Sequence, residues 1–254
     1  MPSTLTPNII LDEEREDILR YLSGQSVRSN FPKAITPAGQ GGKFDLAGNV
    51  LRHPGNTFLC HIDQTSEFYR ALCALQDDIK ASPLSENYVF LPKPSFHMTI
   101  FCGVSGLPLG DDGWPQDIPN SANLDYISRE FAAKLSAWKV RNKFNVRAIG
   151  MSMPGTVRMV PATAQDASNL RNIRHQLQEL TGLYRDDIDS YEFHISLGYL
   201  LRWYNDKTAA AAMNSADELF QLHMAPFSDL ELGPIEFCTF QTMHHFEVFQ
   251  MLGK

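Results

Sequence analysis

The sequence predicts an α+β fold made of two similar halves, each with an antiparallel sheet and helices packed on it. Strand-like stretches are interleaved with stretches whose apolar residues recur at helical spacing. The order of these stretches in residues 56–138 recurs in residues 144–252, and a five-residue pattern occurs once in each half. We therefore expect a bilobal domain with two pseudo-symmetric lobes and a groove between them.

Residues 1–55 lie outside this repeat and predict a helix followed by an arm. Residues 12–22 are acidic with an apolar face, which predicts a short helix that ends near Gly24. The residues that follow are rich in Gly, Pro, Ser and Asn, which is typical of a long loop packed on a domain. Gly42 precedes Lys43, but the GxxxxGK[ST] spacing of a phosphate-binding loop is absent. We therefore assign the arm a structural role beside a bilobal domain over residues 56–254.

Caps, stops and periodicity predict the elements of each half. Ser66 is a candidate helix N-cap in the first half, and Asp166 and Gly182 are candidates for the N-cap and the stop of a helix in the second. The first half is expected to contain a strand at 56–62, a helix at 66–79, an extended stretch at 88–104 and a helix at 124–138. The second is expected to contain an extended stretch at 144–160, a helix at 166–180, a strand at 191–201, a helix at 208–223 and extended runs at 230–252.

Composition excludes several classes of protein. The chain has 22 Lys and Arg against 29 Asp and Glu, a formal charge of −7, which is the wrong sign for a protein that holds long nucleic acid by its phosphates. No stretch approaches the roughly 18 consecutive apolar residues of a membrane span, and the N-terminal region turns acidic where a secretory signal would stay apolar. The four cysteines form no CxxC pair. We expect a cytoplasmic protein without membrane or long nucleic-acid partners.

The five-residue pattern carries the chemistry. Its two copies, FHMTI and FHISL, share the order aromatic, His, aliphatic, hydroxyl, aliphatic. Strand residues two apart point to the same face, so His97 projects with Thr99, and His194 projects with Ser196. If both faces border the groove, two imidazoles and two hydroxyls converge there. Imidazole, with an ordinary pKa of about 6.5, can accept or donate a proton near neutral pH, and hydroxyls can donate hydrogen bonds to phosphoryl oxygens.

These paired motifs resemble those of the 2H phosphoesterase superfamily, which includes the LigT-like RNA 2',3'-cyclic phosphodiesterases, also called 2'-5' RNA ligases, and plant cyclic nucleotide phosphodiesterases. The resemblance covers roughly residues 56–252. It implies a bilobal α+β fold and a groove that needs neither metal nor cofactor. By the same resemblance His97 and His194 are the general acid and base, and Thr99 and Ser196 bind the phosphate. The expected substrate is a small nucleotide or RNA end with a cyclic phosphate.

Two further residues are candidates for substrate binding. Tyr199 stands where the plant enzymes of this superfamily carry a Tyr, although strand alternation places it on the face opposite His194 unless a bulge intervenes. Arg158, in the extended run TVRMV, is either a cation for a substrate phosphate or a surface arginine.

Three alternatives remain open at this stage. His97 and His194 with Asp189 or Glu192 would imitate a metal site of two histidines and one carboxylate, although such a site needs no hydroxyl after each His. The chain is alternatively a nucleotide or RNA-end binding module without turnover. A 2'-5' RNA ligase activity would use the same groups, but it must hold two polynucleotide ends, which the acidic balance disfavours.

Overall fold

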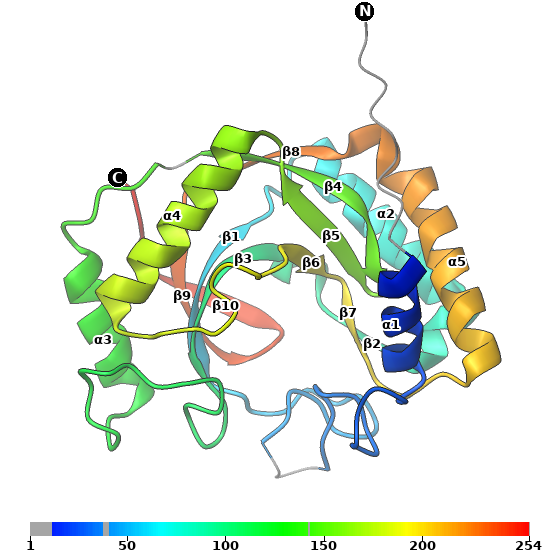
Figure 1. Ribbon diagram of the computed structural model, residues 1–254, viewed down its shortest axis with the longest axis horizontal. Coiled ribbons are helices and arrows are strands. Elements are labelled where there is room, and N and C mark those ends of the chain that lie inside the picture. Colours follow the sequence, from blue (N-terminus) through cyan, green and yellow to red (C-terminus); the bar gives the residue numbers. More distant parts are fainter. Residues whose placement is uncertain (1–11, 38–40, 142, 254) are drawn as a thin grey trace, which may run out of the picture.

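The computed structural model describes residues 12–37, 41–141 and 143–253, and shows a large curled sheet with helices on its outer face (Figure 1). Residues 1–11 and 38–40 of the predicted arm lie outside the described residues. The helices are α1 (Asp12–Leu22), α2 (Glu67–Ala81), α3 (Leu124–Leu135), α4 (Ala164–Thr181) and α5 (Asp206–His223). The described helices include none that is long and apolar enough to cross a bilayer.

An eight-stranded antiparallel sheet runs through the whole molecule in the order β10-β9-β1-β3-β6-β5-β4-β8. Its strands are β1 (Gly55–His61), β3 (His97–Ser105), β4 (Phe144–Met153), β5 (Thr156–Pro161), β6 (His194–Ser196), β8 (Asp229–Leu232), β9 (Glu236–Thr242) and β10 (His245–Met251). A separate two-stranded sheet pairs β2 (Tyr88–Phe90) with β7 (Gly198–Leu200). The predicted α+β class is confirmed, and the two halves of the large sheet are joined where β3 meets β6.

The halves are not consecutive in the chain. β9 and β10 follow β8 in sequence, yet they pair beside β1 and complete the first half of the sheet. The expected extended stretch at 144–160 is a hairpin of β4 and β5. The expected strand at 191–201 is two short strands in different sheets, because the chain bends between Ser196 and Gly198.

Most predicted helices form with the expected ends. The Ser66 side chain accepts a hydrogen bond from the Tyr69 N–H and caps α2, as predicted. Gly182 ends α4 in the left-handed conformation with φ of 67°. The predicted N-cap Asp166 is wrong: Thr163 caps α4, and Asp166 lies in the first turn, where its N–H donates to the Thr163 hydroxyl.

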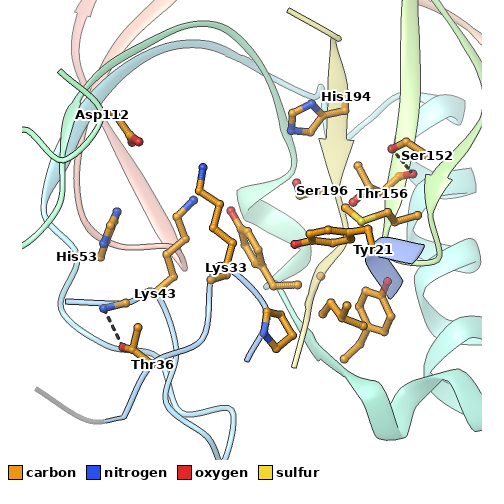
Figure 2. Close-up of a pocket in the computed structure, with 18 of the residues that line it drawn as sticks. Tyr21, Lys33, Thr36, Lys43, His53, Asp112, Ser152, Thr156, His194 and Ser196 are labelled. Carbon is orange, nitrogen blue, oxygen red and sulfur yellow. Dashed lines mark hydrogen bonds between the residues drawn. The ribbon is translucent and has the colours of Figure 1, made fainter. Parts of the chain in front are cut away.

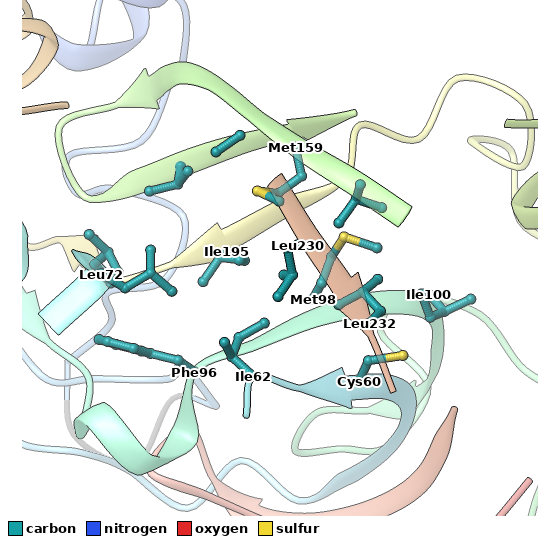
Figure 3. Close-up of a cluster of buried hydrophobic side chains, with 14 of the residues drawn as sticks. Cys60, Ile62, Leu72, Phe96, Met98, Ile100, Met159, Ile195, Leu230 and Leu232 are labelled. Atoms are coloured by element: carbon teal, nitrogen blue, oxygen red, sulfur yellow. The ribbon is translucent and has the colours of Figure 1, made fainter. Parts of the chain in front are cut away.

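Two apolar clusters lie on opposite faces of the sheet. The larger one packs the helices against the outer face; Figure 3 shows part of it, including Leu72, Met98, Met159 and Ile195. The smaller one, on the inner face, contains residues from the arm, from β1, from the β9–β10 hairpin and from the ends of β2 and β7: Ile35, Phe44, Leu59, Leu91, Leu201, Cys238, Phe240, Met243 and Phe246. The arm is therefore anchored on the inner, concave face of the sheet.

Candidate active site

The contact between β3 and β6 brings the two sequence motifs together. Met98 pairs with Ile195 across the two antiparallel strands, and both side chains are fully buried in the outer core. This register sets His97 across from Ser196 and Thr99 across from His194, all on the inner face. The two imidazoles lie on one diagonal of this four-residue set and the two hydroxyls on the other. The predicted convergence of both motifs on one surface follows from a single residue pair.

Both motif histidines are held in the same way by their own backbone. His97 Nδ1 lies 2.7 Å from the Ser95 carbonyl oxygen, and His194 Nδ1 lies 2.9 Å from the Glu192 carbonyl oxygen. Since a carbonyl only accepts, each Nδ1 carries a proton and donates it. In the neutral ring Nε2 is then the proton acceptor, and no group among the described residues hydrogen-bonds to Nε2 of either ring.

The surroundings of His97 favour its neutral form. Its ring packs edge-on against Phe246, with 4.3 Å between ring centroids, and lies 6.1 Å from the ring of His61. Burial is the main cause that lowers the pKa of His97 to about 4, and the neighbouring His61 and His194 contribute because a second positive charge there would be repelled. At neutral pH the His97 ring is therefore a proton acceptor.

A cavity of about 510 Å³ opens beside the second motif. Figure 2 shows His194 and Ser196 at one wall, with Lys33, Lys43, His53 and Asp112 on the other side. His97 and Thr99 do not line this cavity; they lie one strand away on β3. Its lining is Tyr21, Pro32, Lys33, Ala34, Thr36, Gly41, Gly42, Lys43, His53, Tyr88, Asp111, Asp112, Ser152, Met153, Thr156, His194, Ser196, Gly198, Tyr199 and Leu200.

Thr156 adds a third hydroxyl that sequence reasoning missed. It pairs with Ser196 across β5 and β6, and both residues line the cavity. The register between β5 and β6 decides this position, and no local sequence signal reports that register. Thr99 has a different neighbour, the buried hydroxyl of Tyr191.

Tyr199 reaches the cavity because the strand breaks. Gly198 starts β7 and pairs with Phe90 of the small sheet, so the alternation that began at His194 does not continue through it. The Tyr199 ring packs on Phe44, with centroids 5.4 Å apart, and the Lys43 ammonium lies 5.0 Å from its centroid. Strand alternation alone would place Tyr199 on the face opposite His194, and the break between β6 and β7 is the irregularity that removes this restriction.

The arm packs on the sheet and also lines the cavity. Ile35 and Phe44 are buried in the inner cluster. The residues that precede them, Ala34 and Lys43, line the cavity wall. The segment is held by a short backbone ladder in which the Lys43 N–H donates to the Ala34 carbonyl at 3.0 Å. His53 belongs to the same wall; burial and the nearby Lys43 charge lower its pKa.

Arg158 is not brought into this cavity. It pairs with His194 across β5 and β6, but its guanidinium lies 2.5 Å from Glu14 and 2.9 Å from Glu192 and borders a separate cavity. Both charges next to Arg158 are carboxylates of the chain itself. Its geometry is that of an anchor for helix α1, to which Glu14 belongs.

The carboxylates considered for a metal site with the motif histidines have other partners. Asp189 contacts His175 at 3.0 Å, and Glu192 contacts Arg158. Among the described residues, the donor atoms of His61, Glu236 and Cys238 form the group close enough to hold a metal ion, all within 4.8 Å of one another. Here Glu236 accepts the hydrogen bond of His61 Nδ1.

Comparisons with known proteins give one family and a similar structure. Residues 43–157 match the family model described as "2H-phosphodiest: Domain of unknown function (DUF1868)". The crystal structure of ATU0111, a conserved protein of unknown function from Agrobacterium tumefaciens str. C58, is 28% identical, with a TM-score of 0.78 over 93% of this chain and 98% of that one. A phosphoesterase structure is 8% identical, with a TM-score of 0.46 over 79% of this chain and 99% of that one. Curated protein sequences give no match.

The matched segment contains the first motif, strands β1 and β3 of the first half-sheet, and β4 of the second. It extends from Lys43 of the arm to Val157 of β5 and includes His97 and Thr99. The second motif lies beyond the match, but β6 sets it against the first in the register described above. The match over residues 43–157 thus supports, for that part of the chain, a relation to the 2H phosphodiesterase family.

Proposed function

We propose that the protein is a metal-independent phosphodiesterase that hydrolyses the cyclic phosphate of a small nucleotide or an RNA end. The observation that supports it best is the diagonal arrangement of His97, Thr99, His194 and Ser196 across β3 and β6. Both imidazoles present the same nitrogen for proton transfer, because both Nδ1 atoms are held by backbone carbonyls. Two such rings beside two hydroxyls supply an acid, a base and donors for one phosphoryl group.

The environment of each ring suggests its role. His97 is neutral at pH 7 and is the base: its Nε2 takes a proton from water while the water oxygen forms a bond to phosphorus. His194 is the acid: its Nε2 gives a proton to the ribose oxygen as the bond from that oxygen to phosphorus breaks. Thr99 and Ser196 donate hydrogen bonds to the non-bridging oxygens, where charge accumulates in the transition state.

Substitution of either histidine tests this assignment on a panel of nucleoside 2',3'-cyclic phosphates. His97→Ala and His194→Ala should each lower kcat by about 10²–10⁴-fold, the usual contribution of one proton transfer. His175→Ala is the matched control, since that ring lies on α4 and contacts Asp189. Its kcat should stay within about twofold of the parent, and treatment with EDTA should leave the parent rate unchanged.

The other outcomes separate the alternatives. Full activity of either motif variant would remove the two-histidine mechanism. Saturable binding without hydrolysis of any substrate would support the binding-module alternative, and joining of two RNA ends would support the ligase. If EDTA abolished activity and Zn²⁺ restored it, metal independence would be wrong, and the His61, Glu236 and Cys238 group would become the candidate metal site.

A further inference from the structure

Two lysines of the arm enter the cavity without a carboxylate partner. Lys33 and Lys43 both line it, and Figure 2 shows their side chains extending together into the space between the wall of His53 and Asp112 and the wall of His194. Within the described part of the chain, neither ammonium lies within 4.0 Å of a carboxylate. In contrast, Lys93, Lys134 and Lys143 contact Asp77, Asp117 and Glu231 at 2.5–2.6 Å.

The position of Lys43 is fixed by the fold. It precedes the fully buried Phe44, which bridges to Ile35 and to Val50. Its N–H donates to Ala34, and its carbonyl accepts from Leu51 at 2.9 Å. The hydroxyl of Tyr199 raises the pKa of Lys43, so the ammonium keeps its charge at neutral pH. A charge held rigidly in a cavity has already lost the side-chain freedom that ligand binding would otherwise cost.

The charge of the two lysines indicates which kind of ligand group binds beside them. The chain carries a net charge of −7, yet here two ammonium groups line one cavity and, among the described residues, neither has a carboxylate within 4.0 Å. A cyclic phosphodiester has one negative charge, and in the proposed mechanism the motif histidines and hydroxyls already contact the phosphoryl group that carries it. A terminal phosphate carries about −1.5 to −2 at pH 7, which matches two ammonium groups. Asp111 and Asp112 also line the cavity, and Asp112 lies on the side of Lys33 and Lys43, away from His194.

We propose that Lys33 and Lys43 form a second anion site, and that the substrate is a small cyclic phosphodiester that carries an additional phosphate group. This inference rests on the proposed function, because the cyclic phosphate is placed at His194 and Ser196. A cavity of about 510 Å³ is of the size that holds ligands as large as a nucleotide. The arm thus selects among substrates that share the reacting group.

Two substrates that differ by one phosphate test the proposal: adenosine 2',3'-cyclic phosphate with and without a 5'-phosphate. The parent protein should prefer the 5'-phosphorylated form by about tenfold or more in kcat/KM, and the preference should shrink as salt is added. In Lys33→Gln/Lys43→Gln the preference should fall below about threefold. Lys143→Gln is the control, because Lys143 contacts Glu231 away from the cavity, and it should keep the parent preference.

The outcomes distinguish this inference from the proposed function. Hydrolysis of both substrates at equal kcat/KM by the parent protein would overturn the second anion site and leave the phosphodiesterase in place. If neither is hydrolysed, the proposed function fails, and calorimetry with adenosine 2',5'-bisphosphate and adenosine 2'-phosphate decides the inference. Tighter binding of the bisphosphate that is lost in the double variant would support the anion site, whereas equal binding, or none, would overturn it.

Discussion

At the scale of single residues, the two motif histidines share a backbone tether but differ in their surroundings. His97 is packed between Phe246 and His61, whereas His194 borders the open cavity. The sequence does not distinguish the two rings, because FHMTI and FHISL are nearly the same pattern. The difference comes from His61 and Phe246, which are distant in sequence and carry no local signal of their proximity.

The lowered pKa of His97 makes stability depend on pH. The folded protein binds a proton at His97 only near pH 4, whereas in the unfolded chain this group has its ordinary pKa of about 6.5. Between these values the unfolded state binds more protons, so stability falls as the pH drops from about 6.5 to about 4. His97→Gln should remove this part of the decrease, as measured by urea unfolding at pH 7 and pH 5.

NMR titration of the histidine ring protons provides the direct check. The resonance that disappears in His97→Gln should titrate near pH 4 in the parent protein. His175→Gln is the control for unfolding, because its ring lies at the surface, and it should keep the pH dependence of the parent. A His97 resonance with a midpoint near 6.5 would contradict the assignment of His97 as a base that is neutral at pH 7.

At the scale of elements, the break between β6 and β7 positions Ser196 and Tyr199 together. A Cβ atom added at Gly198 would lie 2.7 Å from the Val89 carbonyl oxygen and 3.2 Å from the Phe90 ring. The main chain of β2 must therefore move to accommodate it. Gly198→Ala should lower the free energy of unfolding by about 1–3 kcal/mol and raise KM, because Tyr199 and Ser196 shift with the strand.

Gly150→Ala is a matched control for this change. Gly150 also lies in a strand, β4, but an added Cβ would meet nothing within 4 Å. Its stability in urea should stay within about 0.5 kcal/mol of the parent. Equal effects of the two substitutions would show that the approach of β2 to Gly198 does not determine the site geometry.

Element prediction succeeded where local chemistry decides and failed where distant contacts decide. Ser66 and Gly182 mark helix ends because a cap and a left-handed stop are properties of single residues. Asp166 was the wrong cap because Thr163, also a good cap, precedes it by three residues, and both take part in the same turn. The bend before Gly198 depends on pairing with β2, and no residue near Gly198 in the sequence indicates that pairing.

At the scale of the whole molecule, charge is distributed unevenly. The net charge is −7, while one cavity is bordered by Lys33 and Lys43, neither of which has a carboxylate within 4.0 Å in the part of the chain that the structure describes. An RNA of ~30 nucleotides with hydroxyl ends should therefore show no binding in fluorescence anisotropy up to about 100 µM protein at physiological salt, where general nucleic-acid binders bind with Kd values of about 10⁻⁴–10⁻⁶ M. Micromolar binding of this RNA, independent of its ends, would contradict the expectation of a small ligand.

The overall architecture could be predicted only in part. The repeated order of elements indicated two halves, and the paired motifs indicated that the halves meet at the histidines. The exchange of β9 and β10 into the first half could not be predicted, because a strand pattern such as EFCTFQT identifies its buried face but not its neighbour. The place of Lys33 and Lys43 in the cavity lining could not be predicted for a similar reason, since it depends on the burial of Phe44 among residues of β9 and β10.

The position of β9 has a consequence for biosynthesis. A ribosome releases β1 and β3 early, but the strand that covers the other edge of β1 starts only at Glu236. Until then the nascent chain carries an open strand edge that can pair with other chains. Translation products that stop before Glu236 keep this edge exposed even though they contain both histidine motifs. Such fragments should therefore be lost to aggregation or proteolysis rather than persist as partly active enzyme.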